Sequence, residues 1–343
     1  MHADFMSIAD ANVIVNDREI IYMTRDWEYI PQLYPKQWPY AKHLIPSSRS
    51  LEIDVDSLPK HELAGNIFMP FTMAGNWFHV LFDNYARLYF LGQLPANEPL
   101  RVGVPFWGYP AQSAVPSDRA VVHAAFMHGQ NTVRLEKGIY KIERLIAPPL
   151  ADADDYFCAE PTRFVADCLG HMLKHKVVHH PLRLFVSRAD IGVRNLANEA
   201  ELTAELRRLG FTIVCPGDFS FCTQLELFNA AEFVVGVHGQ GLSAMICARH
   251  CRGLMEFEAA DWAYTAYRSL AKVLGIPYKK LPCELIGIRN PLRFDWLARV
   301  EVGACIAEVE RALEDNERTV SPAEGEILPQ DNSSKPSGTH FLA

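Results

Sequence analysis

The architecture follows most directly from Phe233-Val-Val-Gly-Val-His-Gly-Gln-Gly-Leu-Ser243. An apolar run that suits a buried strand leads straight into a glycine-rich turn, and a helix is expected to follow the turn over residues 241–250. Strands that are apolar throughout need cover on both faces, which is typical of parallel sheets. The stretch therefore predicts one strand–turn–helix unit of a parallel α/β sheet.

The same alternation of strand and helix extends through the C-terminal half. Strands are expected at residues 182–187, 211–215, 233–237, 254–258 and 277–281, with helices at 198–209, 221–230, 241–250 and 262–274. Asn198, Ser220 and Asp261 stand at cap positions, with Glu201 three residues after Asn198, and Gly275 would end the last helix. This order predicts a doubly wound parallel sheet, in which ligands bind outside the carboxyl ends of the strands.

The N-terminal half has a weaker pattern. Strands are expected at residues 19–24 and 100–104, a hairpin over 133–145 turning at Lys137-Gly138, an amphipathic helix over 76–91 and a connecting helix over 164–178. We therefore predict an N-terminal α/β domain over residues 1–165 and a nucleotide-binding domain over 166–316. Residues 317–343, rich in Ser, Pro, Gly and Asn, are predicted to be a disordered tail.

Composition narrows the class of protein. The chain has 343 residues, of which 49% are hydrophobic and 22% charged, and its formal net charge is −8. That length suits two domains, and the absence of an overall basic field argues against nucleic acid as a partner. Eight cysteines without a CxxC pair indicate a reduced, cytoplasmic protein. Residues 1–12 do not resemble a signal peptide, and peripheral contact with an inner membrane stays open.

The glycine-rich turn carries the strongest chemical signal. His238 lies at the end of its strand, Gly239 and Gly241 allow backbone to approach a ligand, and the amides from Gly239 through Gln240 and Gly241 to Leu242 would point at it. Free amides and the helix dipole favour an anion there, and a diphosphate is the natural guest. The alternative is an ordinary strand–turn–helix whose glycines serve packing.

Charged side chains are expected on the same edge of the sheet. Arg188 ends the first strand and Arg194 follows in the next loop, where guanidinium groups can neutralise a diphosphate. Arg194 can equally be a solvated loop residue. Glu256, near the end of a later strand, either receives ribose hydroxyls or is only a charge at the rim.

Two histidine patterns lie outside this edge. His79 and Asp83 are four residues apart on the 76–91 helix, so the carboxylate can orient the imidazole as a general base, unless both belong to a polar stripe. The series His171, His175 and His179 has zinc-like spacing but no further ligands, and a solvated helix face explains it better. We expect no bound metal.

The ordered motifs resemble those of glycosyltransferase family 61, which includes bacterial capsular polysaccharide biosynthesis proteins. The matching pieces are Asn76-Trp-Phe-His79-Val-Leu-Phe-Asp83-Asn-Tyr-Ala-Arg87-Leu, Phe185-Val-Ser-Arg188, Arg194-Asn-Leu-Ala-Asn198-Glu199, Phe221-x-x-Gln224, Val237-His238-Gly239-x-Gly241-Leu242 and Leu254-Met-Glu256.

The resemblance implies a GT-B architecture of two Rossmann-like domains and an inverting transfer from a nucleotide sugar, expected to be a UDP-sugar, without a metal cofactor. The acceptor would be a hydroxyl of a saccharide or glycolipid in bacterial surface polysaccharide synthesis. Arg188, Arg194, His238, Gly239, Gln240, Gly241, Leu242 and Glu256 would hold the donor, while His79 and Asp83 would serve the acceptor with Arg188 stabilising the leaving group. A hydrolase or a non-catalytic nucleotide-sugar-binding module are the alternatives. The sequence does not fix the oligomeric state.

Overall fold

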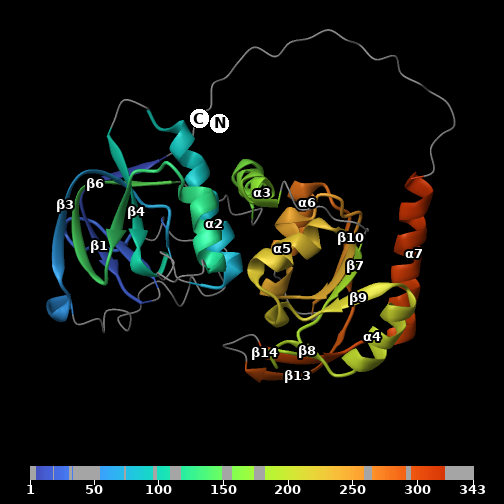
Figure 1. Cartoon of the computed structure of the whole chain (residues 1–343). Helices are drawn as coiled ribbons and strands as arrows, with labels where there is room; N and C mark the ends of the chain where they lie inside the picture. Colours follow the sequence, from blue (N-terminus) through green and yellow to red (C-terminus); the bar gives the residue numbers. More distant parts are fainter. Residues whose placement is uncertain are drawn as a thin grey trace, which may run out of the picture.

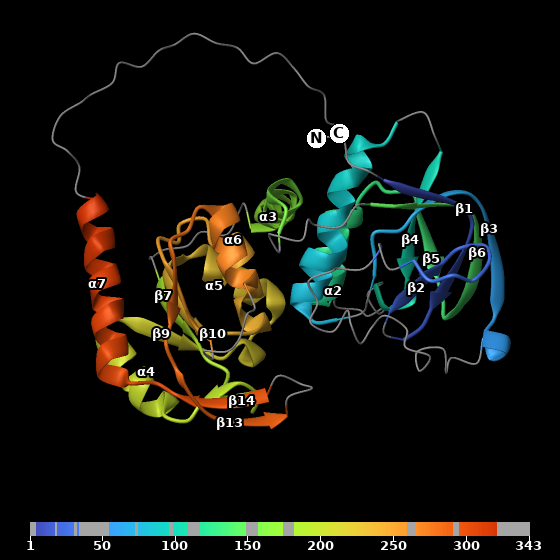
Figure 2. The ribbon, with the colours of Figure 1, turned by 180° about the vertical axis from the view of Figure 1, so that it is seen from behind.

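A computed structural model gives the fold. It describes residues 5–17, 19–30, 33, 55–72, 75–95, 99–108, 117–148, 157–173, 182–258, 265–290 and 295–320. Helices and strands alternate in a mixed α/β arrangement that contains three sheets. Figures 1 and 2 show a sheet from the N-terminal half and a sheet from the C-terminal half, with helices between them.

The N-terminal sheet is mixed, in the order β2-β1-β6-β3-β4-β5. Its strands are β1 (Met6–Val15), β2 (Ile20–Met23), β3 (Lys60–Phe68), β4 (Leu100–Pro105), β5 (Thr132–Leu135) and β6 (Gly138–Ala147). β1 runs antiparallel to β2 and β6, whereas β3, β4 and β5 pair in parallel with their neighbours. The predicted hairpin over 133–145 is wrong, because β5 pairs with β4 at the edge while β6 lies between β1 and β3.

The C-terminal sheet is fully parallel, as predicted, and its strands lie in the order β12-β11-β10-β7-β9. Its strands are β7 (Leu182–Val186), β9 (Phe211–Val214), β10 (Ala231–Val237), β11 (Leu254–Phe257) and β12 (Tyr278–Leu281). The order reverses between β7 and β10, so the chain leaves these two neighbours in opposite directions. Such a switch point is where α/β sheets open a crevice for ligands.

Helices cover both faces of this sheet. α4 (Glu199–Arg208) and α7 (Val302–Val320) contact each other on one face, while α3 (Ala159–Leu173), α5 (Phe221–Asn229), α6 (Ala266–Leu274) and the 3₁₀ helix η8 (Gln240–Cys247) form the other layer. Alternate residues of β10 point into different clusters, Val234 toward η8 and Val235 toward α4 and α7. The uninterrupted apolar strand is thereby buried on both sides.

α3 connects the two halves. It contacts α2 (Asp118–Met127) and η5 (Tyr85–Gln93) of the N-terminal half, and also η8 and α6. Val165 and Leu169 are fully buried in one cluster that takes residues from both large sheets. The predicted domain boundary at residue 165 falls inside this helix. α3 lies between the two large sheets in both views (Figures 1 and 2).

Three helical predictions need correction. Residues 76–91 do not form a regular α-helix: a π-helix η4 (His79–Asn84) passes into the 3₁₀ helix η5, because Asn84 and Arg87 turn inward to bind the backbone of Thr72 and Pro70. The helix after the glycine-rich turn is also 3₁₀, and its narrower winding fits the close contact of Leu242 with Gly236. α7 continues to Val320, so the predicted tail cannot begin at residue 317.

The predicted cap at Asn198 is wrong as well. Its side chain makes no cap hydrogen bond to α4; instead it donates to the Val300 carbonyl at 2.8 Å and accepts from the Val300 amide at 3.0 Å. This pair of bonds ties the start of α4 to the end of β14 (Asp295–Arg299). β14 pairs with β13 (Glu284–Asn290) and β8 (Asn195–Leu196) in a small sheet absent from the sequence prediction. Asp261 and the predicted helix start at residue 262 lie outside the described residues.

Candidate functional site

The switch point brings together the residues that the sequence placed at two separate strand ends. Arg188 follows β7, and His238 and Gly239 follow β10, its neighbour in the sheet. A Cβ atom built on Gly239 would lie 1.7 Å from Nη1 of Arg188, so the guanidinium rests directly against the glycine backbone. The turn and the arginine therefore form one surface.

Arg188 is an unusual cation. It is 4% exposed; Nε donates to the Val193 carbonyl at 3.0 Å, while Nη1 is buried with no hydrogen-bond partner in the described part of the chain. Burial, and then the neighbouring charge of Arg194, lower the pKa of Arg188 to about 10. The group remains charged near neutral pH, and its unused donor is suited to an incoming anion.

Arg194 is held close to this cation by its loop. Its backbone is left-handed, with φ at 57°, and its amide donates to Asp295 Oδ1 at 3.3 Å. Arg194 acts on the charge of Arg188 but is not among the described residues that line the rim cavity.

His238 is fixed from behind. Its Nδ1 lies 2.6 Å from Glu256 Oε1, and the other carboxylate oxygen accepts a 2.8 Å hydrogen bond from the Tyr278 hydroxyl. Glu256 is 1% exposed and both its oxygens are bonded. We predicted that Glu256 receives ribose hydroxyls; this burial argues against that role and makes the carboxylate the group that orients His238.

The glycine turn itself departs from prediction in one respect. The Leu242 amide donates to the Gly239 carbonyl at 3.0 Å, and the Leu242 side chain is fully buried. Leu242 therefore offers no free donor, and the predicted row of amides shortens to Gly239, Gln240 and Gly241. The Gly239 carbonyl also accepts from the Tyr267 hydroxyl at 2.7 Å, a bond from α6 that the sequence did not reveal.

A cavity of about 230 Å³ opens at this rim. Arg188, Gln240 and Gly241 line it from the C-terminal half, and Trp77 and Asp118 line it from the N-terminal half. Trp77 stacks on Phe221 with ring centroids 3.9 Å apart, which closes one side. The volume lies below the usual range of about 300–1,000 Å³ for whole small-molecule ligands, so it suits a diphosphate with part of an attached group.

The turn over residues 216–219 forms another wall of the cavity, and hydrogen bonds from two sides hold it in place. Gln224 donates from Nε2 to the carbonyls of Pro216 and Phe219, at 2.8 and 3.1 Å. Asp190 Oδ2 accepts from the Gly217 amide at 3.1 Å. The Phe221-x-x-Gln224 motif therefore shapes the cavity by holding this turn in place.

His79 and Asp83 pair as expected but lie off the cavity lining. His79 Nδ1 is 2.6 Å from Asp83 Oδ2, with the imidazole 22% and the carboxylate 7% exposed. The two are linked to the rim through Phe78, whose ring meets that of Tyr267 at 5.8 Å. Arg87 points elsewhere, donating to the carbonyls of Pro70 and Pro148.

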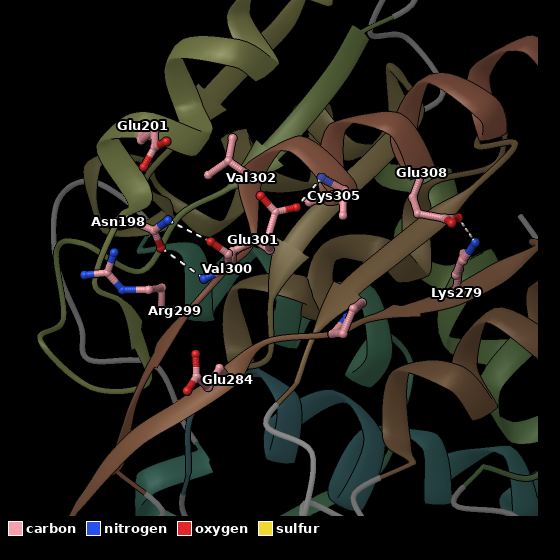
Figure 3. Close-up of a pocket in the computed structure, with 12 residues that line it drawn as sticks. Asn198, Glu201, Lys279, Glu284, Arg299, Val300, Glu301, Val302, Cys305 and Glu308 are labelled. Atoms are coloured by element: carbon pink, nitrogen blue, oxygen red, sulfur yellow. Dashed lines mark hydrogen bonds and ion pairs between the residues drawn. The ribbon is translucent and has the colours of Figure 1, made fainter.

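A larger cavity, of about 670 Å³, lies elsewhere, between α4, β14 and the start of α7 (Figure 3). Of its charged groups, Glu308 pairs with Lys279, and Glu301 accepts from the Ala304 amide at the start of α7. None of the predicted donor residues lines it. The smaller rim cavity is therefore the better candidate site.

Among the described residues, no group of three or more His, Cys, Asp or Glu side chains is arranged to hold a metal ion. His171 Nδ1 contacts the Asp167 carbonyl of its own helix, and His175 and His179 lie outside the described residues. No described helix has the length and apolar character needed to cross a bilayer.

A model of a known protein family matches a range that contains much of this site. Residues 77–255, just over half of the chain, match the family model described as Glycosyltransferase 61. The matched range includes His79, Arg188 and His238. No curated protein matches the chain.

The solved structures that are similar to this chain include the bacterial iron-containing dodecameric glycosyltransferase TibC from enterotoxigenic E. coli H10407. Identity is 12% and the TM-score 0.31, over 70% of this chain and 64% of that chain. The chain thus spans less than two thirds of the TibC structure.

Proposed function

The chain belongs to glycosyltransferase family 61, and on that basis we propose that it transfers a sugar from a nucleotide sugar to a hydroxyl group of a saccharide or glycolipid acceptor. The single observation that carries the proposal is the buried, unused Nη1 donor of Arg188 against the Gly239 backbone. Burying such an N–H donor costs free energy unless a ligand accepts a hydrogen bond from it.

The donor side of the proposal assigns the diphosphate to this rim. Arg188, with Arg194 beside it, neutralises the negative charge that develops as the sugar departs, and the amides of Gly239, Gln240 and Gly241 receive phosphate oxygens. With its Nδ1 held by Glu256, His238 is proposed to act on the diphosphate through the glycine turn that follows it, since no histidine lines the cavity in the described part of the chain. We propose a UDP-sugar as donor and a GT-B arrangement of the two halves around it.

The acceptor side is assigned to the N-terminal half. The His79 and Asp83 pair lies close to Trp77, which lines the cavity, so a saccharide that reaches the rim passes beside it. We propose that His79 positions the acceptor and that transfer inverts the anomeric centre. A place in bacterial surface polysaccharide synthesis, at the cytoplasmic side of the membrane, belongs to the same proposal.

The test is a screen of UDP-, GDP- and CMP-sugars against a set of p-nitrophenyl glycosides, with released nucleotide and glycosylated product both quantified. Transfer predicts that product forms in proportion to nucleotide. Nucleotide release without product would favour a hydrolase. Binding of the donor without release of nucleotide would favour a non-catalytic module, and either result contradicts the proposal.

A further inference from the structure

The rim cavity has a second charged wall, formed by α2. Asp118 is the first residue of that helix and lines the cavity opposite the C-terminal residues that include Arg188. Ser117 caps the helix by accepting from the Ala120 amide at 3.3 Å, so its hydroxyl fixes where the helix begins. The position of the Asp118 carboxylate is therefore set by the helix start.

Several contacts pin this helix end to the site. Asp118 Oδ2 accepts from the Phe221 amide, across to α5 of the C-terminal half. Arg119 donates to the Gly75 carbonyl at 3.0 Å and lies 5.7 Å from the centre of the Trp77 ring. Trp77 stacks in turn on Phe221. The carboxylate is held at a junction of both halves rather than on a free surface.

Sugar transfer to a hydroxyl requires a base at the acceptor side. Among the described residues that line the cavity, the only carboxylates are Asp118 and Asp190, and no histidine is present. Asp190 lies two residues from Arg188 and accepts from the Gly217 amide, and its charge supports the Arg188 cation. It therefore belongs to the donor side.

We propose that Asp118 is the general base of the transfer, an inference that rests on the proposed function. The Asp118 carboxylate removes the proton from the acceptor hydroxyl while the acceptor oxygen bonds to the anomeric carbon. The bond from that carbon to the phosphate oxygen breaks, and its electron pair leaves on the diphosphate beside Arg188. The proton then passes from Asp118 to water.

The geometry favours Asp118 over His79 in this role. His79 is absent from the cavity lining, whereas Asp118 reaches it, and Asp118 Oδ1 accepts no hydrogen bond within the described part of the structure. One oxygen anchors the residue and the other is available to a substrate. His79 keeps the positioning role.

The test compares Asp118→Asn with Asp190→Asn, two isosteric changes in one cavity, using the best donor and p-nitrophenyl glycoside from the screen. Asp118→Asn keeps an oxygen that can accept from the Phe221 amide, so the fold should persist. We expect kcat to fall about 10²- to 10⁴-fold, with the dissociation constant for UDP within about threefold of wild type. Asp190→Asn should instead weaken the binding of UDP, because that carboxylate belongs to the donor side.

A kcat near wild type in Asp118→Asn would overturn the inference. So would a loss of UDP binding comparable to the loss of turnover, since a base should spare the donor. A wild-type chain that binds UDP but transfers no sugar would contradict the proposed function itself, before any variant is compared.

Discussion

Gly239 leaves no room for a side chain beside Arg188. The two residues follow different strands, β7 and β10, yet the guanidinium occupies the place where a Cβ would stand. The glycine is required here for close approach, because it lets a cation reach the amides that follow β10. At the scale of single residues, the site is the contact between the backbone of Gly239, which has no side chain, and the buried guanidinium of Arg188.

Replacing Arg188 with alanine removes the buried donor. If this cation stabilises the leaving diphosphate, kcat should fall by about 10²-fold or more, as on loss of one oxyanion donor. Steady-state kinetics with the best donor measures the effect. Arg183→Ala is the matched control, since Arg183 lies at the other end of β7 in a half-exposed pair with Glu232; full activity in Arg188→Ala would remove the role.

Replacing Gly239 with alanine tests the contact from the other side. The new methyl group would displace the guanidinium, 1.7 Å from its Nη1, so UDP affinity should drop about as far as in Arg188→Ala. Isothermal titration with UDP checks this. Gly92→Ala is the control, because its new methyl group lies in open space and the variant should bind UDP normally. Gly65→Ala would not serve, because the φ of Gly65 is 79° and an alanine there would be strained. Unchanged affinity in Gly239→Ala would mean that the arginine is not held where the structure has it.

At the scale of elements, the local pattern predicted the C-terminal sheet well and the details of its helices less well. β7, β9, β10 and β11 are short, largely apolar runs between turn signals, and such runs need no distant partner to be recognised. β12 contains two lysines, which suits its place at the edge of the sheet. The predicted cap at Asn198 was wrong because Asn at the start of a helix usually caps it, whereas this side chain does not. Its real partner, Val300, lies 102 residues away, and no spacing rule reports such a contact.

Asn198→Asp distinguishes these two roles. A cap tolerates Asp as well as Asn, but here the Nδ2 donor to the buried Val300 carbonyl would be lost, at a cost of about 1–3 kcal/mol in the free energy of unfolding. Ser220→Asp is the control, since Ser220 caps α5 by accepting from Thr223 and should tolerate the change. Urea denaturation of both variants measures the difference; equal stabilities would restore the cap interpretation.

At the scale of the whole molecule, the site depends on how the two halves meet. The sequence identified Arg188 and His238 because each ends an apolar strand. It missed Tyr267, Tyr278 and Asp118, whose roles come from contacts between elements: Asp118 reaches Phe221 over 103 residues, and Tyr267 reaches the glycine turn from α6. These three residues follow no spacing pattern in the sequence, so only the assembled fold brings them to the site.

The central claim is that the rim between β7 and β10 receives two linked phosphates. The most direct measurement is the thermal stabilisation of wild type and Arg188→Ala by UDP, with uridine as the phosphate-free comparison. At a hundred times its dissociation constant, UDP should raise the stability of wild type by about 2.7 kcal/mol. Uridine should give far less, and Arg188→Ala should lose most of the UDP effect. Equal stabilisation of both proteins by UDP, or equal stabilisation by UDP and uridine, would contradict the account.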